Sequence, residues 1–246
     1  YLELLEKFKL IQDIEGINFK FKKKPLDMYF SIKELVEGER FDTISGALQA
    51  YTEYLVTKWV QNIVKLTGVK KICIAGGVAM NVKANMLLAK IDEVDFVFVP
   101  PCPDDTSLAI GCIQSYLHTK FPENRKQINS LNNVYLGFSA STELVKLKEK
   151  LEDFNTTLKF SLSNFDIVEV ANLISKGKII GRISGAEEFG ARALGNRSIL
   201  ANPRDASMRD KLNRVIKKRE GFRPFAPSVT VNQASKWFNL KQSVPY

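Results

Sequence analysis

The chain has 246 residues, of which 45% are hydrophobic and 26% are charged, a composition typical of a globular protein with one or two domains. No stretch approaches the roughly 18 consecutive apolar residues of a membrane-spanning helix, which argues against an integral membrane protein. The net charge is +9, and residues 176–223 alone hold 13 Lys and Arg against 5 Asp and Glu, a net charge of +8. This local excess favours an anionic partner such as a nucleotide, a phosphate compound or nucleic acid.

The start of the chain and its cysteines bear on where the protein is found. No signal peptide is visible, and three cysteines without CxxC spacing are typical of reduced, mostly buried thiols. We therefore expect a cytoplasmic protein. Because the chain opens at Tyr1 without a methionine, we also expect it to be part of a longer protein.

The first half of the sequence alternates between helical and strand patterns. The expected elements are a helix over 43–67 ended by Gly68, a strand over 70–75, a helix over 78–90, a strand over 95–100, and a turn and helix over 101–117. This alternation predicts an α/β layer. Earlier, "FKFKKK" (19–24) alternates aromatic residues with lysines, which favours a solvated edge strand over a nucleic-acid contact.

A polar segment over 118–133 is interpreted as a linker, which gives two domains, 1–133 and 134–246. The second domain is predicted to be α/β as well, with shorter strands and more turns. Its expected elements are strands over 133–138, 156–162, 178–184 and 227–231, and helices over 141–152, 164–177 and 205–218.

Two motifs of the first domain carry candidate ligand-binding residues. In "AGGVAMN" (75–81), two glycines between a strand and a helix let a ligand approach the backbone, and Asn81 and Asn85 lie on one helical face. In "PPCPDDTSLAIG" (100–111), Asp104 and Asp105 suit either a helix N-cap or a metal ligand. His118 is the only histidine, and we expect it to lie at a helix end as a capping cation.

The second domain contains two clusters of cations beside glycine and proline. "EFGARALGNRSILANPR" (188–204) contains Arg192, Arg197 and Arg204, and only Glu188 is acidic. "VIKKREGFRPFAPSV" (215–229) places four cations within seven residues, followed by two prolines that favour an extended backbone. Guanidinium groups bind phosphate and carboxylate in bidentate fashion. The two clusters favour a pocket for a small polyanion over an open nucleic-acid surface.

These two segments together closely resemble the signature of the NodU/CmcH family of O-carbamoyltransferases, and "AGGVAMN" with Asn85 and the turn at Asp105 resemble the same family's upstream segment. The resemblance covers about residues 43–246. It implies the C-terminal part of an actin-like ATPase (Kae1-like) domain followed by a YrdC/Sua5-like α/β domain. The implied reaction moves a carbamoyl group from carbamoyl phosphate, through a carbamoyl-adenylate made with ATP, to the hydroxyl of a small-molecule acceptor.

The resemblance also implies roles for individual residues. It implies nucleotide contacts from Gly76, Gly77, Asn81, Asn85, Arg192 and Arg197. It implies that Lys218, Arg219 and Arg223 are the catalytic residues of the adenylation pocket. It implies that Asp105 is one ligand of an iron ion, Fe²⁺, whose other ligands lie outside this chain. Mg²⁺ would accompany the nucleotide, and a homodimer stays open.

The chain departs from the family pattern at two positions of the first cation motif. Ala186 replaces an arginine that the family carries before its Glu-Phe-Gly, and Ala191 replaces a proline. Ala186 keeps one alternative open, a catalytically inactive regulatory relative. The local charge of +8 and "FKFKKK" keep open a second alternative, an RNA-binding protein.

Overall fold

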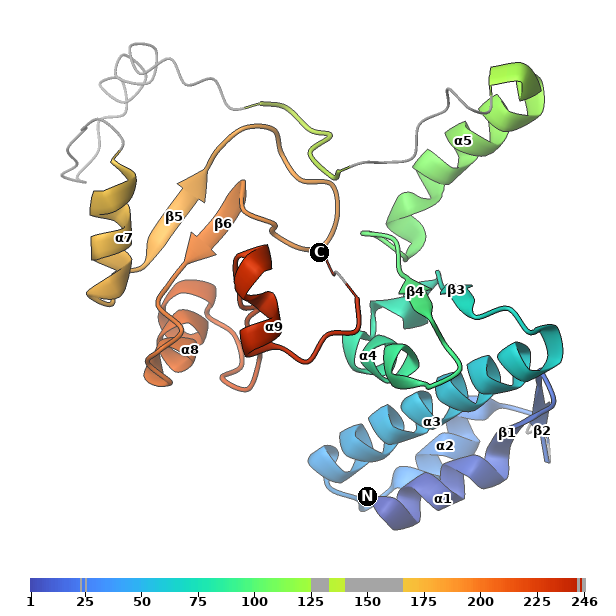
Figure 1. The fold of residues 1–246 in the computed structure, drawn as a ribbon. Coiled ribbons are helices and arrows are strands. Elements are labelled where there is room, and N and C mark those ends of the chain that lie inside the picture. Colours follow the sequence, from blue (N-terminus) through green and yellow to red (C-terminus); the bar gives the residue numbers. More distant parts are fainter. Residues whose placement is uncertain (23, 25, 125–132, 140–165, 243, 245–246) are drawn as a thin grey trace. The chain divides into compact units, whose positions relative to one another are not determined.

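A computed structural model describes residues 1–22, 24, 26–124, 133–139, 166–242 and 244, and these residues form mixed α/β structure (Figure 1). The chain divides into two compact units, one made of residues 1–128 with 240–245 and one made of residues 129–239. No helix in the described ranges is both long enough and apolar enough to cross a membrane.

The first unit holds five helices and four short strands among its described residues. In chain order they are α1 (Leu2–Ile11), β1 (Gln12–Glu15), β2 (Asn18–Phe21), α2 (Met28–Val36), α3 (Phe41–Thr67), β3 (Lys71–Cys73), α4 (Val82–Lys90), β4 (Phe96–Phe98) and α5 (Leu108–Lys120). The predicted helices over 43–67 and 101–117 and the strands over 70–75 and 95–100 are confirmed. Gly68 ends α3 in the left-handed conformation, with φ of 69°.

Strands β1 and β2 form an antiparallel hairpin that is fastened to α3 by side-chain hydrogen bonds. Trp59 Nε1 and Asn62 Nδ2, both on α3, donate to the backbone oxygens of Ile17 and Gly16 at the hairpin turn. The expectation of an edge strand in "FKFKKK" is confirmed for residues 19–21, and Lys20 is exposed beside Glu15 at 3.1 Å. Contact of this hairpin with nucleic acid stays the less favoured alternative.

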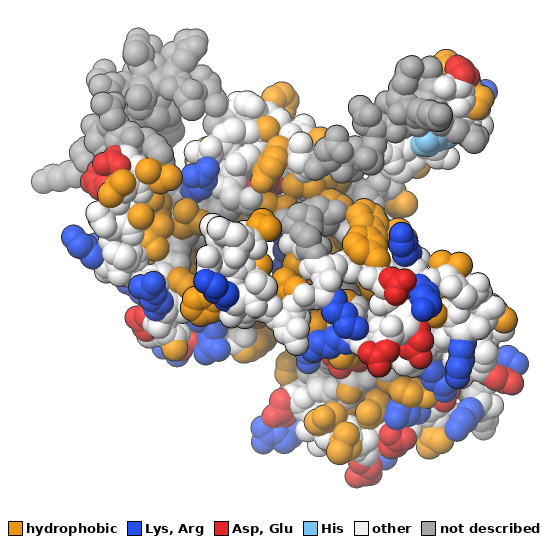
Figure 2. All heavy atoms as spheres, viewed as in Figure 1, with side chains coloured by type: hydrophobic (Ala, Val, Ile, Leu, Met, Phe, Trp, Pro, Cys, Tyr) orange, Lys and Arg blue, Asp and Glu red, His pale blue; other side chains and the backbone are white. Residues whose placement is uncertain are grey.

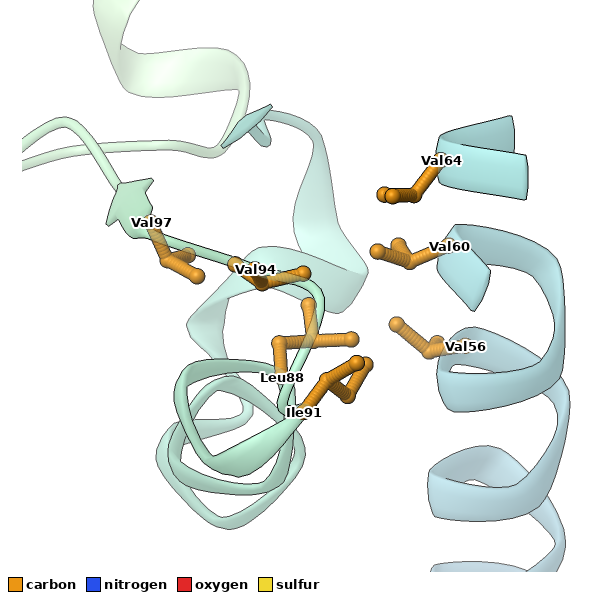
Figure 3. Packing of buried hydrophobic residues seen from close by; sticks show 7 residues of the cluster. All are labelled: Val56, Val60, Val64, Leu88, Ile91, Val94 and Val97. Atoms are coloured by element: carbon orange, nitrogen blue, oxygen red, sulfur yellow. The ribbon is translucent and has the colours of Figure 1, made fainter. Parts of the chain in front are cut away.

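The core of the first unit consists of two clusters of buried residues along α3. Near its end, α3 buries valines four residues apart, which face the side chains of α4 and β4 (Figure 3). The residues of this cluster are Val56, Val60, Val64, Leu88, Ile91, Val94 and Val97. Near its start, α3 packs Ala47 against Leu4 and Phe8 of α1. Leu48 of α3, although apolar, is 53% exposed, whereas the neighbouring Ala47 is buried.

A parallel two-stranded sheet of β3 and β4 carries the loops of interest in the first unit. The register pairs Lys71 with Phe96 and Cys73 with Phe98. The side chain of Gln242, near the end of the chain, pairs with the backbone of β4 as a neighbouring strand would. Its amide oxygen accepts from Val97 N at 3.0 Å, and its NH₂ group donates to Val97 O at 2.7 Å. Gln242 is thereby held on the first unit.

The second unit is built from short elements and long turns. Its described elements are α7 (Ile167–Ser175), β5 (Ile180–Ile183), β6 (Arg197–Leu200), α8 (Ser207–Lys211) and α9 (Ala234–Trp237), with a π-helical turn over Leu212–Lys217. Strands β5 and β6 are antiparallel and pair Ile180 with Leu200 and Ile183 with Arg197. The helices predicted over 164–177 and 205–218 and the strand over 178–184 are confirmed, the second helix with its π-helical end.

Two predicted strands are wrong, and two further predicted elements cannot be compared. Residues 133–138 are not a strand, although Gly137 and Phe138 exchange backbone hydrogen bonds with Glu187 at 3.0 Å. Residues 227–231, which begin at Pro227, form no strand, because nothing in the described range pairs with them. The predicted helix over 141–152 and strand over 156–162 lie outside the described residues.

The charged side chains lie on the surface as the sequence predicts, but the cysteines are more exposed than expected. Acidic and basic side chains are interleaved over the first unit (Figure 2), as expected from its near-neutral sequence. Of the three cysteines only Cys102 is buried, whereas Cys73 and Cys112 are exposed, so the expectation of mostly buried thiols is wrong.

Candidate functional site

The glycine loop and the acidic turn of the first unit lie side by side. Because β3 and β4 are parallel, the loops that follow them leave the same edge of the sheet, where ligands bind in open α/β sheets. Gly76 N donates to Pro103 O at 2.6 Å and joins the two loops directly. Gly76 has φ of 100°, which disfavours any residue with a Cβ atom. At Gly77 a Cβ would meet no atom within 4 Å, so its surroundings are open.

The two asparagines that follow the glycines make hydrogen bonds inside the protein. Asn81 is the N-cap of α4, and its Oδ1 accepts from Ala84 N at 3.1 Å. The same amide forms a reciprocal pair with Gln49 of α3, with both distances at 3.0 Å. Asn85 Nδ2 donates to Ala79 O at 2.7 Å. These contacts hold the glycine loop in place, and contact of either amide with a nucleotide stays a prediction.

The adjacent acids of the turn have different roles. Asp104 is the N-cap, since its Oδ1 accepts from the backbone N–H and the hydroxyl of Thr106. Asp105 is exposed, and its carboxylate has no partner among the described residues. The cap reading is therefore confirmed for Asp104, while Asp105 stays available for a ligand. His118 lies in the last turn of α5, as expected for a C-terminal cation.

The described residues do not make an iron site by themselves. Within the described ranges, no group of three His, Cys, Asp or Glu side chains lies close enough to hold a metal ion. One exposed carboxylate supplies at most two oxygen ligands, fewer than the three or four protein ligands of stable transition-metal sites. Iron ligation by Asp105 thus depends on residues beyond those described here.

In the second unit, Glu188 organises the first cation loop, residues 188–204. Its Oε1 accepts from Leu194 N and Asn196 N, both at 2.7 Å, and its Oε2 accepts from Arg197 N at 3.1 Å. Desolvation raises the pKa of Glu188, but these three backbone hydrogen bonds and the charge of Arg197 together lower it below its ordinary value. The carboxylate is therefore ionised at neutral pH and fixes the turn that contains Gly190 and Gly195.

Arg197 is bound by backbone carbonyl oxygens from its own loop and from two other segments of the second unit. Its Nη1 donates to Ser184 O at 2.9 Å and to Asn196 O at 3.1 Å, and its Nη2 donates to Phe138 O at 3.4 Å. Glu187 lies 3.9 Å from the same Nη2. Most donors of this guanidinium are thus used within the protein, and a nucleotide contact by Arg197 stays a prediction.

Arg192 differs from Arg197 in this respect. It lies in the turn between Glu188 and Leu194, it is exposed, and its guanidinium has no partner in the part of the chain that the structure describes. The same is true of the side chain of Arg204. Arg192 is therefore an unpaired cation in a turn whose later residues are bound by the carboxylate of Glu188.

The second cation loop, residues 218–223, begins at a residue with a strained backbone, Lys218. Lys218 has φ of 48° and ψ of 50° and is the sole non-glycine residue with positive φ among those described. This conformation costs an ordinary residue roughly 1–2 kcal/mol. Its ammonium group is exposed and has no partner in the described ranges. It follows a π-helical turn, a feature that is frequent at functional sites.

The two arginines after Lys218 are oriented by specific contacts. Arg219 Nε donates to Asn213 Oδ1 at 2.7 Å, and its guanidinium carbon lies 4.8 Å from the centre of the Phe225 ring. Arg223 Nε donates to Glu220 Oε2 at 2.7 Å. Arg219 and Arg223 thus have partners within the second unit, whereas the ammonium group of Lys218 has none in the described ranges. No hydrogen bond or ion pair joins this loop to the first cation loop within the described ranges.

The sequence analysis missed three residues that position this machinery. Glu188, Asn213 and Gln49 are neither candidate ligands nor catalytic residues, yet each holds a candidate loop by two or more hydrogen bonds. A signal existed for Glu188, the lone acid before a run of cations. None existed for Asn213, because its partners lie five to ten residues ahead in a turn whose course the sequence does not specify.

Comparison with known proteins agrees with the motifs. Residues 1–113 match the family model described as "Carbamoyltransferase N-terminus", and residues 171–246 match "Carbamoyltransferase C-terminus". The chain is 38% identical over 204 residues to "Nodulation protein NolO" of Bradyrhizobium diazoefficiens, covering 80% of this chain and 35% of that protein.

Two further relatives extend the match. "Nodulation protein U" of Sinorhizobium fredii is 35% identical over 224 residues, or 90% of this chain and 35% of that protein. "Uncharacterized protein MJ1058" of Methanocaldococcus jannaschii is 30% identical over 234 residues, or 95% of this chain and 37% of that protein. The chain thus spans little more than a third of the length of these relatives.

Proposed function

The chain belongs to the carbamoyltransferase family, and from this membership we propose that the whole protein transfers a carbamoyl group to a substrate hydroxyl. We propose carbamoyl phosphate as the donor and a carbamoyl-adenylate, made with ATP, as the intermediate. In this proposal the second unit belongs to a YrdC/Sua5-like domain that carries out the adenylation. The first unit belongs to an actin-like ATPase (Kae1-like) domain that completes the transfer.

The proposed reaction balances in three steps. Water cleaves carbamoyl phosphate to carbamate and inorganic phosphate. A carbamate oxygen then attacks the α-phosphorus of ATP, and the bond from this phosphorus to the bridging oxygen breaks to release pyrophosphate. Finally the substrate hydroxyl oxygen attacks the carbamoyl carbon, AMP leaves, and the hydroxyl proton passes to a base or to solvent.

The observation that carries the proposal is the contrast between fixed backbones and unpaired cations in the second unit. Glu188 and Asn213 hold the two loops by three side-chain hydrogen bonds each, while Arg192 and Lys218 project from those loops without a partner in the described ranges. Cations on a backbone that is ordered before the ligand arrives can stabilise the negative charge that builds up during attack on a phosphorus atom. A purely structural cation has no need of this arrangement.

Each cation has a proposed task. Arg192 and Lys218 bind the phosphates of ATP through their free charges, and Arg219 presents the remaining N–H groups of its guanidinium beside them. Arg223 holds the loop through Glu220 and exchanges that carboxylate for a phosphate when the nucleotide binds. In the first unit, Gly76 and Gly77 leave room for a nucleotide beside Asp105, which we propose as one ligand of a metal ion completed by residues outside this chain.

Exchange of labelled pyrophosphate into ATP tests the adenylation step, because the exchange requires a reversible attack on the α-phosphorus. We expect exchange that depends on carbamoyl phosphate and that Lys218→Ala lowers at least tenfold, about 1.4 kcal/mol of transition-state stabilisation. Lys176→Ala, which removes an exposed cation outside both loops, is the matched control.

The control separates a specific role from bulk charge. Equal loss of exchange in the two variants would show that only the net positive charge matters. ATP binding without any exchange dependent on carbamoyl phosphate would contradict the adenylation chemistry while leaving the nucleotide site in place.

A further inference from the structure

Asn213 is the one polar residue whose side chain is fully buried among the described residues, with none of its surface exposed. It lies in the π-helical turn over Leu212–Lys217, just before the second cation loop. Burying an amide costs free energy unless its hydrogen-bonding groups are satisfied, so its contacts indicate what it does.

All the side-chain contacts of Asn213 go to the second cation loop. Its Oδ1 accepts from Arg219 Nε at 2.7 Å, and its Nδ2 donates to Gly221 O at 3.2 Å and to Arg223 O at 2.8 Å. One amide thus contacts three of the loop's residues. It fixes both the direction of a guanidinium and the path of the backbone that carries it.

The backbone of Asn213 adds a further constraint. Its carbonyl oxygen accepts from Lys218 N and from Arg219 N, the latter at 3.0 Å. The first of these bonds closes the π-helical turn at the residue that adopts the left-handed conformation. The strained conformation of Lys218 is thereby held by the same residue that orients Arg219.

We propose that Asn213 is a positioning residue that sets the anion affinity of the second cation loop without touching the anion itself. This inference rests on the proposed function, since it assumes that Lys218 and Arg219 bind phosphate. A loop fixed in its binding conformation loses little entropy when the ligand arrives, so release of the loop should weaken binding rather than remove a contact.

The test compares two buried residues of the same helical stretch. Asn213→Leu keeps the branched shape and the number of heavy atoms of the side chain and removes its three hydrogen bonds. Met208→Ala removes a buried apolar side chain of α8 that makes no hydrogen bond to the loop. We expect both variants to lower the melting temperature. We expect the Kd for ATP to rise at least about tenfold in Asn213→Leu and to stay within about twofold of wild type in Met208→Ala.

A second readout follows the loop directly. The Nε proton of Arg219 should exchange with solvent slowly in the wild type and in Met208→Ala, and rapidly in Asn213→Leu, as measured by nitrogen-edited NMR. If Asn213→Leu does not fold, Asn213→Ser serves in its place, because a serine hydroxyl is too short to reach all three partners.

The outcomes separate this inference from the proposed function. Wild-type affinity for ATP in the Asn213 variant, or an equal loss in Met208→Ala, would overturn the positioning role alone. A wild-type chain that binds neither ATP nor pyrophosphate would overturn the proposed function, and the positioning role with it.

Discussion

Arg197 donates from its Nη1 to the carbonyl oxygen of Ser184 at 2.9 Å, and this bond ties the start of β6 to the end of β5. Strand pairing already places Ile183 opposite Arg197. The guanidinium adds a side-chain hydrogen bond to the next residue, Ser184, just beyond the paired strands. A cation in a motif typical of phosphate binding thus contributes first to the stability of the fold.

We expect Arg197→Ala to lower the free energy of unfolding by about 2–3 kcal/mol, because several carbonyl oxygens in a half-buried site lose a charged donor together. Denaturant unfolding measures this change. Arg204→Ala is the control, since the exposed guanidinium of Arg204 has no partner in the described ranges and its loss should stay within about 0.5 kcal/mol. Equal stability of the two variants would contradict the structural role of Arg197.

The carboxylate of Glu188 predicts a pH dependence of stability. Because the folded state lowers the pKa of Glu188, its contribution is fully present above the pKa of the unfolded chain. That contribution is lost as the pH falls through the lower folded pKa, when protonation removes the acceptor for three backbone N–H groups. We expect wild type to lose more stability than Glu188→Gln between pH 7 and the acidic end of this range, as measured by unfolding at each pH.

Glu188→Gln itself should lower stability at neutral pH, because its NH₂ group meets backbone N–H groups where an oxygen is required. Parallel pH profiles for the two proteins would show that Glu188 titrates with an ordinary pKa and would remove it as the organiser of the loop.

The conformation of Lys218 predicts a trade-off between stability and binding. Glycine adopts positive φ without strain, so Lys218→Gly should raise the free energy of unfolding by up to about 1 kcal/mol while it weakens ATP binding. Lys217→Gly is the matched control. Its site is a helical turn, where glycine costs roughly 0.5–1 kcal/mol. Thermal unfolding with ATP titration measures both effects, and a destabilised Lys218→Gly would contradict the strain.

Much of the first unit could be predicted from the sequence because its signals are local. The apolar spacing of α3 and the glycine after it specify both the helix and its end, and the "KKICIA" and "DFVFVP" runs specify the two parallel strands. The errors lie where long-range pairing decides the structure. Residues 133–138 and 227–231 have strand-like composition, but β-propensity reflects packing against a partner more than backbone preference.

The candidate site could be predicted in its residue types but not in their roles. Charge alone groups Arg192 with Arg197, whereas the structure separates an unpaired cation from one bound by carbonyl oxygens. The difference arises from the turn between Glu188 and Arg197. Its hydrogen bonds span six to nine residues, a range in which neither helical nor strand periodicity gives a signal.

The most direct test of the proposed nucleotide site is calorimetric titration of ATP into the wild type and into Arg192→Ala. At Arg192 an effect on binding is not mixed with an effect on stability. Its exposed guanidinium has no partner in the described ranges, so its removal should change the free energy of unfolding by no more than about 0.5 kcal/mol. Lys178→Ala removes another exposed cation of the same unit, outside both loops, and controls for bulk charge. The account predicts that Arg192→Ala weakens ATP binding at least 30-fold, about 2 kcal/mol, and that Lys178→Ala stays within about twofold of wild type. Equal ATP affinity in Arg192→Ala and wild type would contradict the assignment of the first cation loop to the nucleotide.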